Sequence, residues 1–184
     1  MKPFPNAGPI QLEWIQPRTF THYFELRHGD DLLATLTWER LLSNLATAET
    51  AHGTWTLEQP GILNQRVEVR ELATGRRVAN FYPKLSGSGV LEFVDGRDLE
   101  WEPTNFWATN WSSYDESDSP SLAIEEGVQG SRWRDMFKTQ FTVTVDHAQW
   151  TPAELALLAA LGLYLIILRQ EATAGAVAAI SAVV

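Results

Sequence analysis

The sequence TPAELALLAALGLYLIILR, residues 151–169, places the strictest demand on the rest of this 184-residue chain. Thr151 and Glu154 have the spacing of a capping box, and Pro152 takes the first helical position, where its missing N–H costs nothing. No residue in 155–168 is charged, so a helix here is apolar on every side and needs apolar surroundings. It rises about 21 Å, short of the roughly 30 Å core of a bilayer, so we expect protein to surround it.

Short runs of alternating apolar and polar residues, separated by turn residues, precede this helix. Asp95-Gly96, between the apolar-polar runs 91–94 and 98–101, is the strongest hairpin signal. The pattern predicts strands at 12–16, 22–27, 32–38, 45–49, 54–58, 66–72, 77–82, 89–94, 99–101, 107–114, 121–125 and 139–145.

These two features together predict the fold class. Strands of this length rise roughly 17 to 23 Å, which matches the apolar helix, and a sheet closed around the helix would bury its whole circumference. We therefore predict a mainly β protein, a closed antiparallel barrel of about twelve strands around a central hydrophobic C-terminal helix. It forms a single domain over residues 1–184, with barrel strands in about 12–145, the core helix at 152–169 and an extra tail at 170–184.

Composition narrows the classes of function. The chain has 14 Lys and Arg against 23 Asp and Glu, a net charge of −9 that repels a phosphate backbone, so we expect no nucleic-acid partner. It has no cysteine, which excludes disulfides and thiolate sites. The first nine residues hold three prolines and no apolar run of signal-peptide length, so we expect a cytoplasmic protein.

The sequence contains no strong candidate for a catalytic residue. Ser86 and Ser88 lie in a glycine-bearing turn between two strands, whereas a nucleophile elbow or a phosphate loop needs a helix to follow. The histidines have no metal-ligand spacing, and the acidic groups 115–118 and 125–126 lack the order of a calcium loop or a catalytic carboxylate pair. We predict no catalytic residue, no metal and no cofactor.

Two clusters are better candidates for binding. The first is basic, can hold phosphate or carboxylate groups, and comprises Arg66, Arg70, Arg76 and Arg77, with a second basic run at 132–138. We favour the interpretation that these arginines lie on a charged outer face of the barrel and pair with neighbouring acids such as Glu68. The second cluster is aromatic and comprises Trp101, Trp107 and Trp111. These residues could stack on a sugar or a partner protein, although core filling is favoured.

The chain resembles the tubby C-terminal-like superfamily, which includes tubby proteins, LURP-one-related proteins and phospholipid scramblases. The resemblance rests on the late strand at 141–145, which leads through Thr151-Pro152 into the apolar helix, and on the hairpin segments 53–57 and 94–101. It spans residues 12–168 and implies a closed barrel of about a dozen strands threaded by a hydrophobic helix.

The resemblance also implies a functional class. Members bind phosphoinositide headgroups or are implicated in lipid movement, and the tubby headgroup site uses Lys and Arg on the barrel exterior. No matching positions can be assigned here, since Lys occurs only at Lys2, Lys84 and Lys138. Our leading hypothesis is a non-catalytic binding or interaction module, with an unknown protein or an anionic lipid headgroup as partner.

Two alternatives remain open at this level. One is peripheral contact with anionic lipid or phosphoinositide through Arg66 to Arg77. The other is a membrane anchor in which the apolar C-terminal segment runs on through residues 176–184. The anchor would place Arg169 and Glu171 inside the bilayer at roughly 2.5 to 3.5 kcal/mol each, so membrane contact is the less favoured reading.

Overall fold

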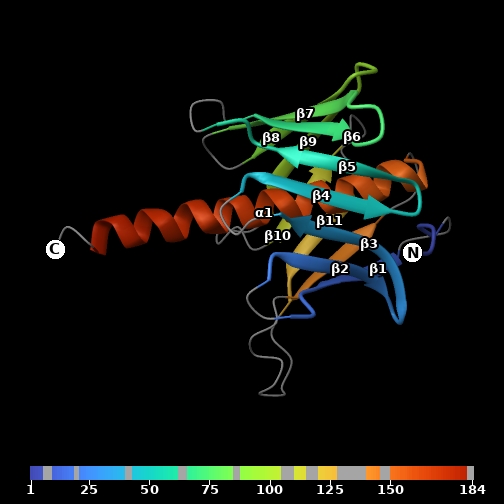
Figure 1. Cartoon of the computed structure of the whole chain (residues 1–184), viewed down its shortest axis with the longest axis horizontal. Coiled ribbons are helices and arrows are strands. Elements are labelled where there is room, and N and C mark those ends of the chain that lie inside the picture. Colours follow the sequence, from blue (N-terminus) through green and yellow to red (C-terminus); the bar gives the residue numbers. More distant parts are fainter. Residues whose placement is uncertain are drawn as a thin grey trace.

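The computed structural model describes residues 1–5, 10–18, 21–39, 43–61, 66–84, 88–104, 110–127, 140–145 and 150–181. Within these ranges, twelve strands precede one helix (Figure 1). The strands are β1 (Ile10–Ile15), β2 (Tyr23–His28), β3 (Asp31–Trp38), β4 (Leu45–Thr50), β5 (Gly53–Glu58), β6 (Val67–Glu71), β7 (Arg77–Pro83), β8 (Gly89–Phe93), β9 (Asp98–Pro103), β10 (Asn110–Tyr114), β11 (Pro120–Glu126) and β12 (Gln140–Val145). The helix is α1 (Pro152–Ser181).

The strands form one closed antiparallel barrel in sequence order. Each strand pairs with the next, and β1 closes the ring on β12 in a register that runs from Ile10 opposite Val145 to Ile15 opposite Gln140. The predicted fold class is therefore confirmed, and each predicted strand overlaps an observed one. The predicted Asp95-Gly96 hairpin joins β8 to β9, with Gly96 at a positive φ of 90° that favours glycine.

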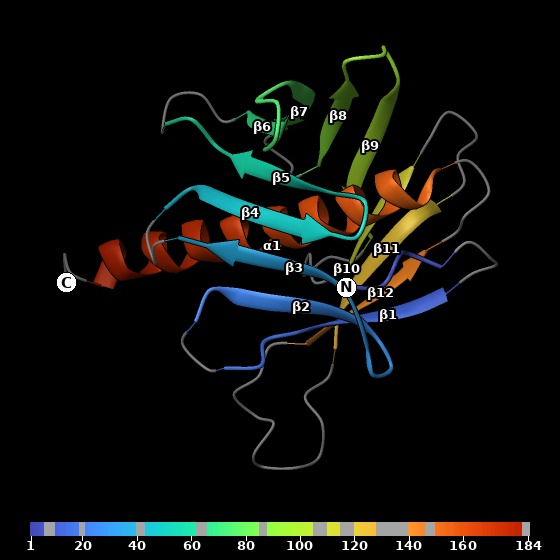
Figure 2. The same ribbon diagram turned by 45° about the vertical axis from the view of Figure 1, so that its right-hand side comes forward.

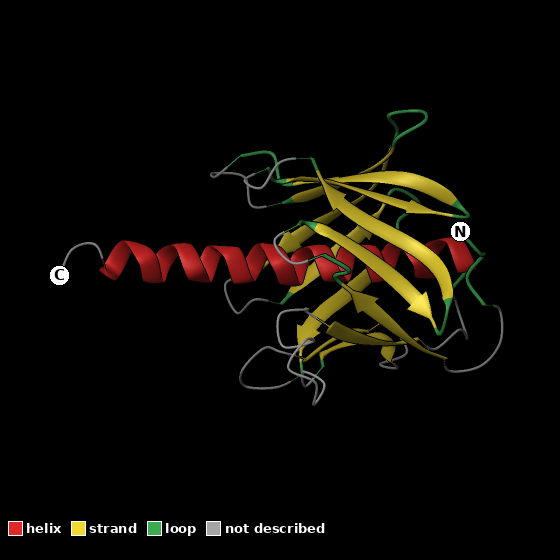
Figure 3. Cartoon of the chain, turned by 60° about the horizontal axis from the view of Figure 1, so that its bottom comes forward, coloured by secondary structure: helices red, strands yellow, loops and turns green. Residues whose placement is uncertain are grey.

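The helix passes through the middle of the barrel (Figures 2 and 3). Every residue from Leu155 to Tyr164 is buried, and both of these are fully so. Successive helical residues point in all directions around the axis, so only enclosure on every side can bury ten in a row. The surrounding wall is made of the inward residues of the strands, such as Leu57 on β5 and Val143 on β12, which alternate with outward ones.

Tyr164 brings the one hydroxyl group into the apolar stretch of the helix. Its ring stacks on Trp38 with centroids 5.7 Å apart, and its hydroxyl donates to the backbone carbonyl of Asn44. Burial raises the pKa of the phenol. The hydroxyl is thus satisfied by the chain just before β4, and this polar group does not need water.

Gly162 lets the helix approach the barrel wall closely. A Cβ atom there would lie 2.5 Å from Cδ1 of Ile124 and 2.6 Å from Cη2 of Trp101, both closer than real carbon contacts. Glycine in a helix ordinarily costs about 1 kcal/mol relative to alanine. Here its small size is what allows β9 and β11 to pack against the helix.

The helix start is fixed by the predicted capping box. The amide of Thr151 donates to the Glu154 carboxylate at 2.8 Å, and the amide of Glu154 donates to the Thr151 hydroxyl at 3.3 Å. Arg97, from the β8–β9 turn, donates to both Glu154 and Asp95 and lies 5.1 Å from the ring centre of Trp150. The hairpin is thereby tied to the end of the barrel where the helix enters.

The helix ends later than the sequence predicts. The predicted end at Arg169 is wrong, because α1 continues to Ser181, and residues 170–181 are helix rather than a separate tail. No proline interrupts this segment, and it is rich in alanine, the strongest helix former. Burial does end near the predicted point, since residues 169–173 are exposed. The helix therefore projects beyond the strands (Figure 1).

One helix in the described ranges is long and apolar enough to cross a membrane. Residues 152–173 meet that criterion by length and composition, but 67% of the most apolar window is buried inside the barrel. A buried core helix passes the same test as a membrane span, and the buried part of α1 has the apolar surroundings that such a helix needs.

Replacing Gly162 with Val is expected to lower the free energy of unfolding by about 2 to 3 kcal/mol, because the side chain collides with Trp101 and Ile124. Urea denaturation measures the change. Ala172→Val is the matched control, since Ala172 is an exposed position of the same helix and only helix propensity changes there, by about 0.5 kcal/mol. Equal effects at the two positions would contradict close packing at Gly162.

Replacing Glu154 with Gln is expected to lower the free energy of unfolding by about 1 kcal/mol at pH 7, because the capping box and the bond from Arg97 weaken. Partial burial raises the pKa of Glu154, but the hydrogen bonds from Arg97 and Thr151 outweigh it and the net shift is downward. A carboxylate with a lowered pKa stabilises the fold above its unfolded pKa of about 4.3 and loses this effect as the pH falls.

The difference between wild type and Glu154→Gln should therefore shrink below about pH 4. Urea denaturation at neutral and acidic pH tests this expectation. Glu92→Gln, at an exposed carboxylate on β8, is the control and should change stability by less than about 0.5 kcal/mol. A pH-independent deficit in Glu154→Gln would argue against a charge-dependent cap.

Candidate functional site

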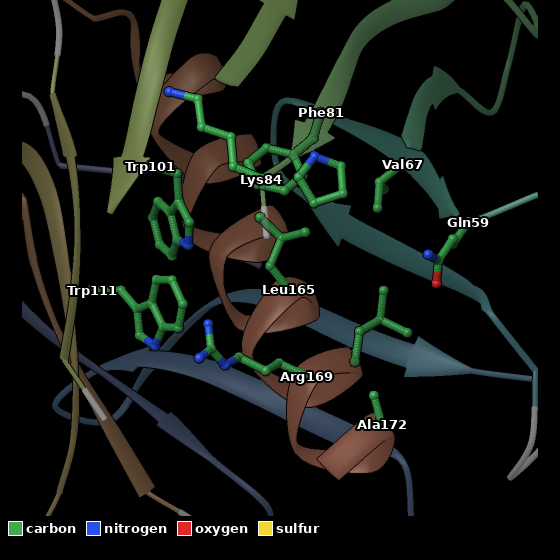
Figure 4. Close-up of a pocket in the computed structure, with 11 residues that line it drawn as sticks. Gln59, Val67, Phe81, Lys84, Trp101, Trp111, Leu165, Arg169 and Ala172 are labelled. Carbon is green, nitrogen blue, oxygen red and sulfur yellow. The ribbon is translucent and has the colours of Figure 1, made fainter. Parts of the chain in front are cut away.

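A cavity opens where the helix leaves the barrel, and we call it the exit cavity. It has a volume of about 380 Å³. Its lining consists mostly of apolar and aromatic side chains with three longer polar ones, as Figure 4 shows: Gln59, Val67, Phe81, Pro83, Lys84, Trp101, Trp111, Leu165, Leu168, Arg169 and Ala172. Ligand sites in proteins are typically apolar concavities of roughly 300 to 1,000 Å³ with a few polar groups, so the exit cavity has the composition of a small-molecule site.

Two stacked indoles form one wall of the exit cavity. Trp101 on β9 and Trp111 on β10 lie with ring centroids 5.9 Å apart and planes at 11°. In the strand register Trp101 is opposite Ser113 and Trp111 is opposite Pro103, so the two indoles are diagonal neighbours on the inward face. Both are nearly fully buried, and the Trp101 ring is fixed against the Gly162 backbone.

The structure places two members of the predicted aromatic cluster. Trp101 and Trp111 are buried and line the cavity, so neither forms an outward stacking surface. Trp107 lies outside the described residues.

Arg169 stands at the mouth of the exit cavity. It is exposed, one helical turn beyond Leu165, and its guanidinium carbon lies 5.1 Å from the ring centre of Trp111, at cation–π distance (Figure 4). Among the described residues no carboxylate lies within 4.0 Å of this guanidinium. Glu171, two residues further on, is directed elsewhere, with its carboxylate 3.6 Å from Nε2 of His22.

Lys84 is the second cation of the lining. It follows β7, and its Nζ lies 3.5 Å from Oε1 of Glu100 on β9. Both side chains are about half exposed, so this pair contributes little to stability, but it does offset part of the lysine charge. Arg169 is therefore the cation of the exit cavity that lacks a counter-charge in the described part of the chain.

The predicted basic cluster lies on the outside of β6 and around the β6–β7 turn. Arg66 and Arg70 both bind Glu68, with nitrogen to oxygen distances of 2.5 and 2.7 Å. The hydrogen bonds from Arg70 and Arg66 lower the pKa of Glu68, against a smaller upward effect of burial. Arg70 also donates to the backbone carbonyl of Gly75. These two arginines thus pair with an acid on the outer face of the barrel.

Arg76 and Arg77 complete the cluster and differ from the other two. Both are exposed, Arg76 in the turn and Arg77 at the start of β7. Neither has an ion pair with a described carboxylate. The structure therefore brings all four arginines to one region, but only Arg76 and Arg77 carry charge that a partner could use.

The remaining candidates take structural positions. The Ser88 carbonyl accepts the amide of Lys84, which closes the β7–β8 connection, while Ser86 lies outside the described residues. His52 accepts the backbone amide of Phe4 at 3.2 Å. Glu125 is exposed on β11. Residues 115–118, 132–138 and 147 also lie outside the described part, and within it no group of three His, Asp or Glu side chains could hold a metal ion.

From the sequence, Arg169 is expected to end the apolar helix or, in the anchor alternative, to lie in the bilayer; a cavity beside it is not expected. The sequence does indicate the position of Arg169, because the first charged residue after an uninterrupted apolar helix must lie where that helix leaves its apolar surroundings. Nothing in the sequence marks Gln59, Val67 and Ala172 as lining residues of the exit cavity, since their place there depends on which strands border the end of the barrel.

Comparison with known proteins supports the fold. No protein-family model and no curated protein matches the chain. The X-ray structure of a protein from Arabidopsis thaliana is similar, with a TM-score of 0.58 over 89% of this chain and 94% of that one, at 16% sequence identity. At this identity the likeness extends to the fold: a closed twelve-stranded barrel with a C-terminal helix.

Proposed function

We propose that the protein is a non-catalytic binding module that holds a small ligand in the exit cavity. The stacked pair Trp101 and Trp111 is the observation that carries the proposal. Two large, nearly fully buried aromatic rings border a cavity at the end of the barrel where the helix leaves it. Aromatic faces of this kind contribute much of the binding energy in small-molecule sites.

A rigid scaffold favours this role over catalysis. The helix fills the barrel, so the exit cavity has walls that are already packed before a ligand arrives. A preformed site loses little conformational entropy on binding. The described lining contains one lysine and one arginine but no carboxylate or histidine that would act as a general base beside a nucleophile.

The finer family assignment is also a proposal. The closed barrel in sequence order, threaded by a hydrophobic C-terminal helix, supports membership of the tubby C-terminal-like superfamily, including its LURP-one-related branch. Binding without turnover accords with that family, and the cytoplasmic location expected from the sequence belongs to the same proposal. Our candidate site differs from the tubby headgroup site, which is on the barrel exterior.

Filling the exit cavity should abolish binding of an apolar probe. The neutral fluorophore N-phenyl-1-naphthylamine is expected to bind saturably with one site per chain. Ala172→Trp places an indole at the mouth and should weaken binding at least about tenfold, or 1.4 kcal/mol. Ala73→Trp, in the exposed β6–β7 turn, is the matched control and should bind as wild type does. Unchanged binding by Ala172→Trp, or no saturable binding by wild type, would contradict the proposal.

A second candidate function is membrane contact through the projecting part of the helix. The observation that favours it is the continuation of α1 to Ser181 beyond the barrel, in a segment where residues 172–184 contain no charged side chain. An apolar helix that leaves the globule needs a lipid or protein surround to bury it.

Flotation with phosphatidylcholine and phosphatidylserine vesicles tests this second candidate. The full chain is expected to float, whereas a chain that ends after Thr173 should stay in the bottom fraction while keeping its near-ultraviolet circular dichroism. Flotation of both chains, lost at high salt, would instead assign the contact to Arg76 and Arg77. No flotation of the full chain would end the membrane candidate.

A further inference from the structure

We infer that the ligand of the exit cavity is a small monoanion with an apolar body, whose carboxylate pairs with Arg169 while its body lies against the wall that Trp101 and Trp111 form. This inference rests on the proposed binding function and adds the chemical class of the ligand. It follows from the geometry and the charge of the cavity mouth.

The Arg169 guanidinium lies beside the cavity wall. Its carbon is 5.1 Å from the centre of the Trp111 ring, at cation–π distance. A contact of this kind with the ring uses no hydrogen bond of the guanidinium. A planar fork of N–H groups matches a carboxylate or phosphate with two parallel hydrogen bonds.

Arg169 and Glu171 are directed to different sides of the helix. On the helix, residues two apart lie about 200° around the axis, so Arg169 and Glu171 face opposite sides. Glu171 approaches His22 before β2, while Arg169 lies in the cavity lining with Leu165 and Leu168. The guanidinium therefore meets the cavity without its own helix supplying a counter-charge on that side.

The charges around the exit cavity indicate how many charges the ligand carries. The described lining holds two cations, and Lys84 is partly offset by Glu100, so one uncompensated charge remains. The chain as a whole carries −9, which repels anions at longer range, and more strongly the more highly they are charged. These conditions fit a monoanion better than a headgroup with several phosphates.

The walls of the cavity indicate the rest of the ligand. Apart from Gln59, Lys84 and Arg169 they are apolar side chains, two of them indoles, and nearby aromatic surface lowers the local dielectric and strengthens a charge-assisted hydrogen bond. A volume of about 380 Å³ limits the apolar body to a short chain or a single ring system. A soluble small molecule, rather than a lipid in a bilayer, is therefore the occupant.

Calorimetry with matched probes tests the ligand class. Octanoate, 1-octanol and inorganic phosphate are titrated into the full chain. Octanoate is expected to bind at least about tenfold more tightly than 1-octanol, and inorganic phosphate should not bind measurably. Arg169→Gln should remove the advantage of octanoate, with 1-octanol unaffected. Arg18→Gln makes the same charge change at an exposed site outside the cavity and should keep that advantage.

The outcomes separate this inference from the binding function. Equal binding of octanoate and 1-octanol, or an anion advantage that survives Arg169→Gln, overturns the ligand class while binding of the neutral fluorophore leaves the exit cavity as a site. Binding of inorganic phosphate as tight as that of octanoate overturns the apolar body. Arg169-dependent flotation with anionic vesicles, without octanoate binding, assigns the arginine to a lipid surface and overturns the small-molecule occupant.

Discussion

The structure depends on the mutual burial of the helix and the barrel. A helix without a polar face cannot rest on one side of a sheet, because its far side would meet water, and a barrel of twelve strands without contents would enclose a void. Each element removes the unfavourable surface of the other. Gly162 marks the tightness of the fit, since a single added carbon atom there meets Trp101 and Ile124. The position of the exit cavity follows from the same arrangement, because it lies where the helix leaves the wall of strands.

Much of this architecture is legible in the sequence for simple physical reasons. Alternation of period two marks strands that face a core on one side, and the Asp95-Gly96 pair fixes one hairpin. The capping box fixes the helix start to the residue. The sequence predicts the C-terminal end of the helix at Arg169, twelve residues too early. The change from apolar to charged residues there marks the end of burial, whereas a helix ends where helix propensity falls or a capping residue stops it.

The candidate site could be predicted only in part. The pairing of Arg66 and Arg70 with Glu68 follows from their spacing by two along one strand, which puts them on one face. The exit cavity does not follow, because Trp101 and Trp111 become neighbours through the register of β9 against β10. Arg169 joins them through the depth at which the helix sits in the barrel. Neither the register of β9 against β10 nor the depth of the helix in the barrel can be predicted from a local sequence pattern.

The order of the elements along the chain has a consequence for biosynthesis. All twelve strands leave the ribosome before the helix that fills them, and β1 must wait for β12 before the ring can close. Until that helix has been made, the inward leucines and tryptophans of the strands stay uncovered, the condition in which aggregation competes with folding. Native packing of the barrel therefore waits for its most C-terminal strand and for the helix, however early the first strands are made.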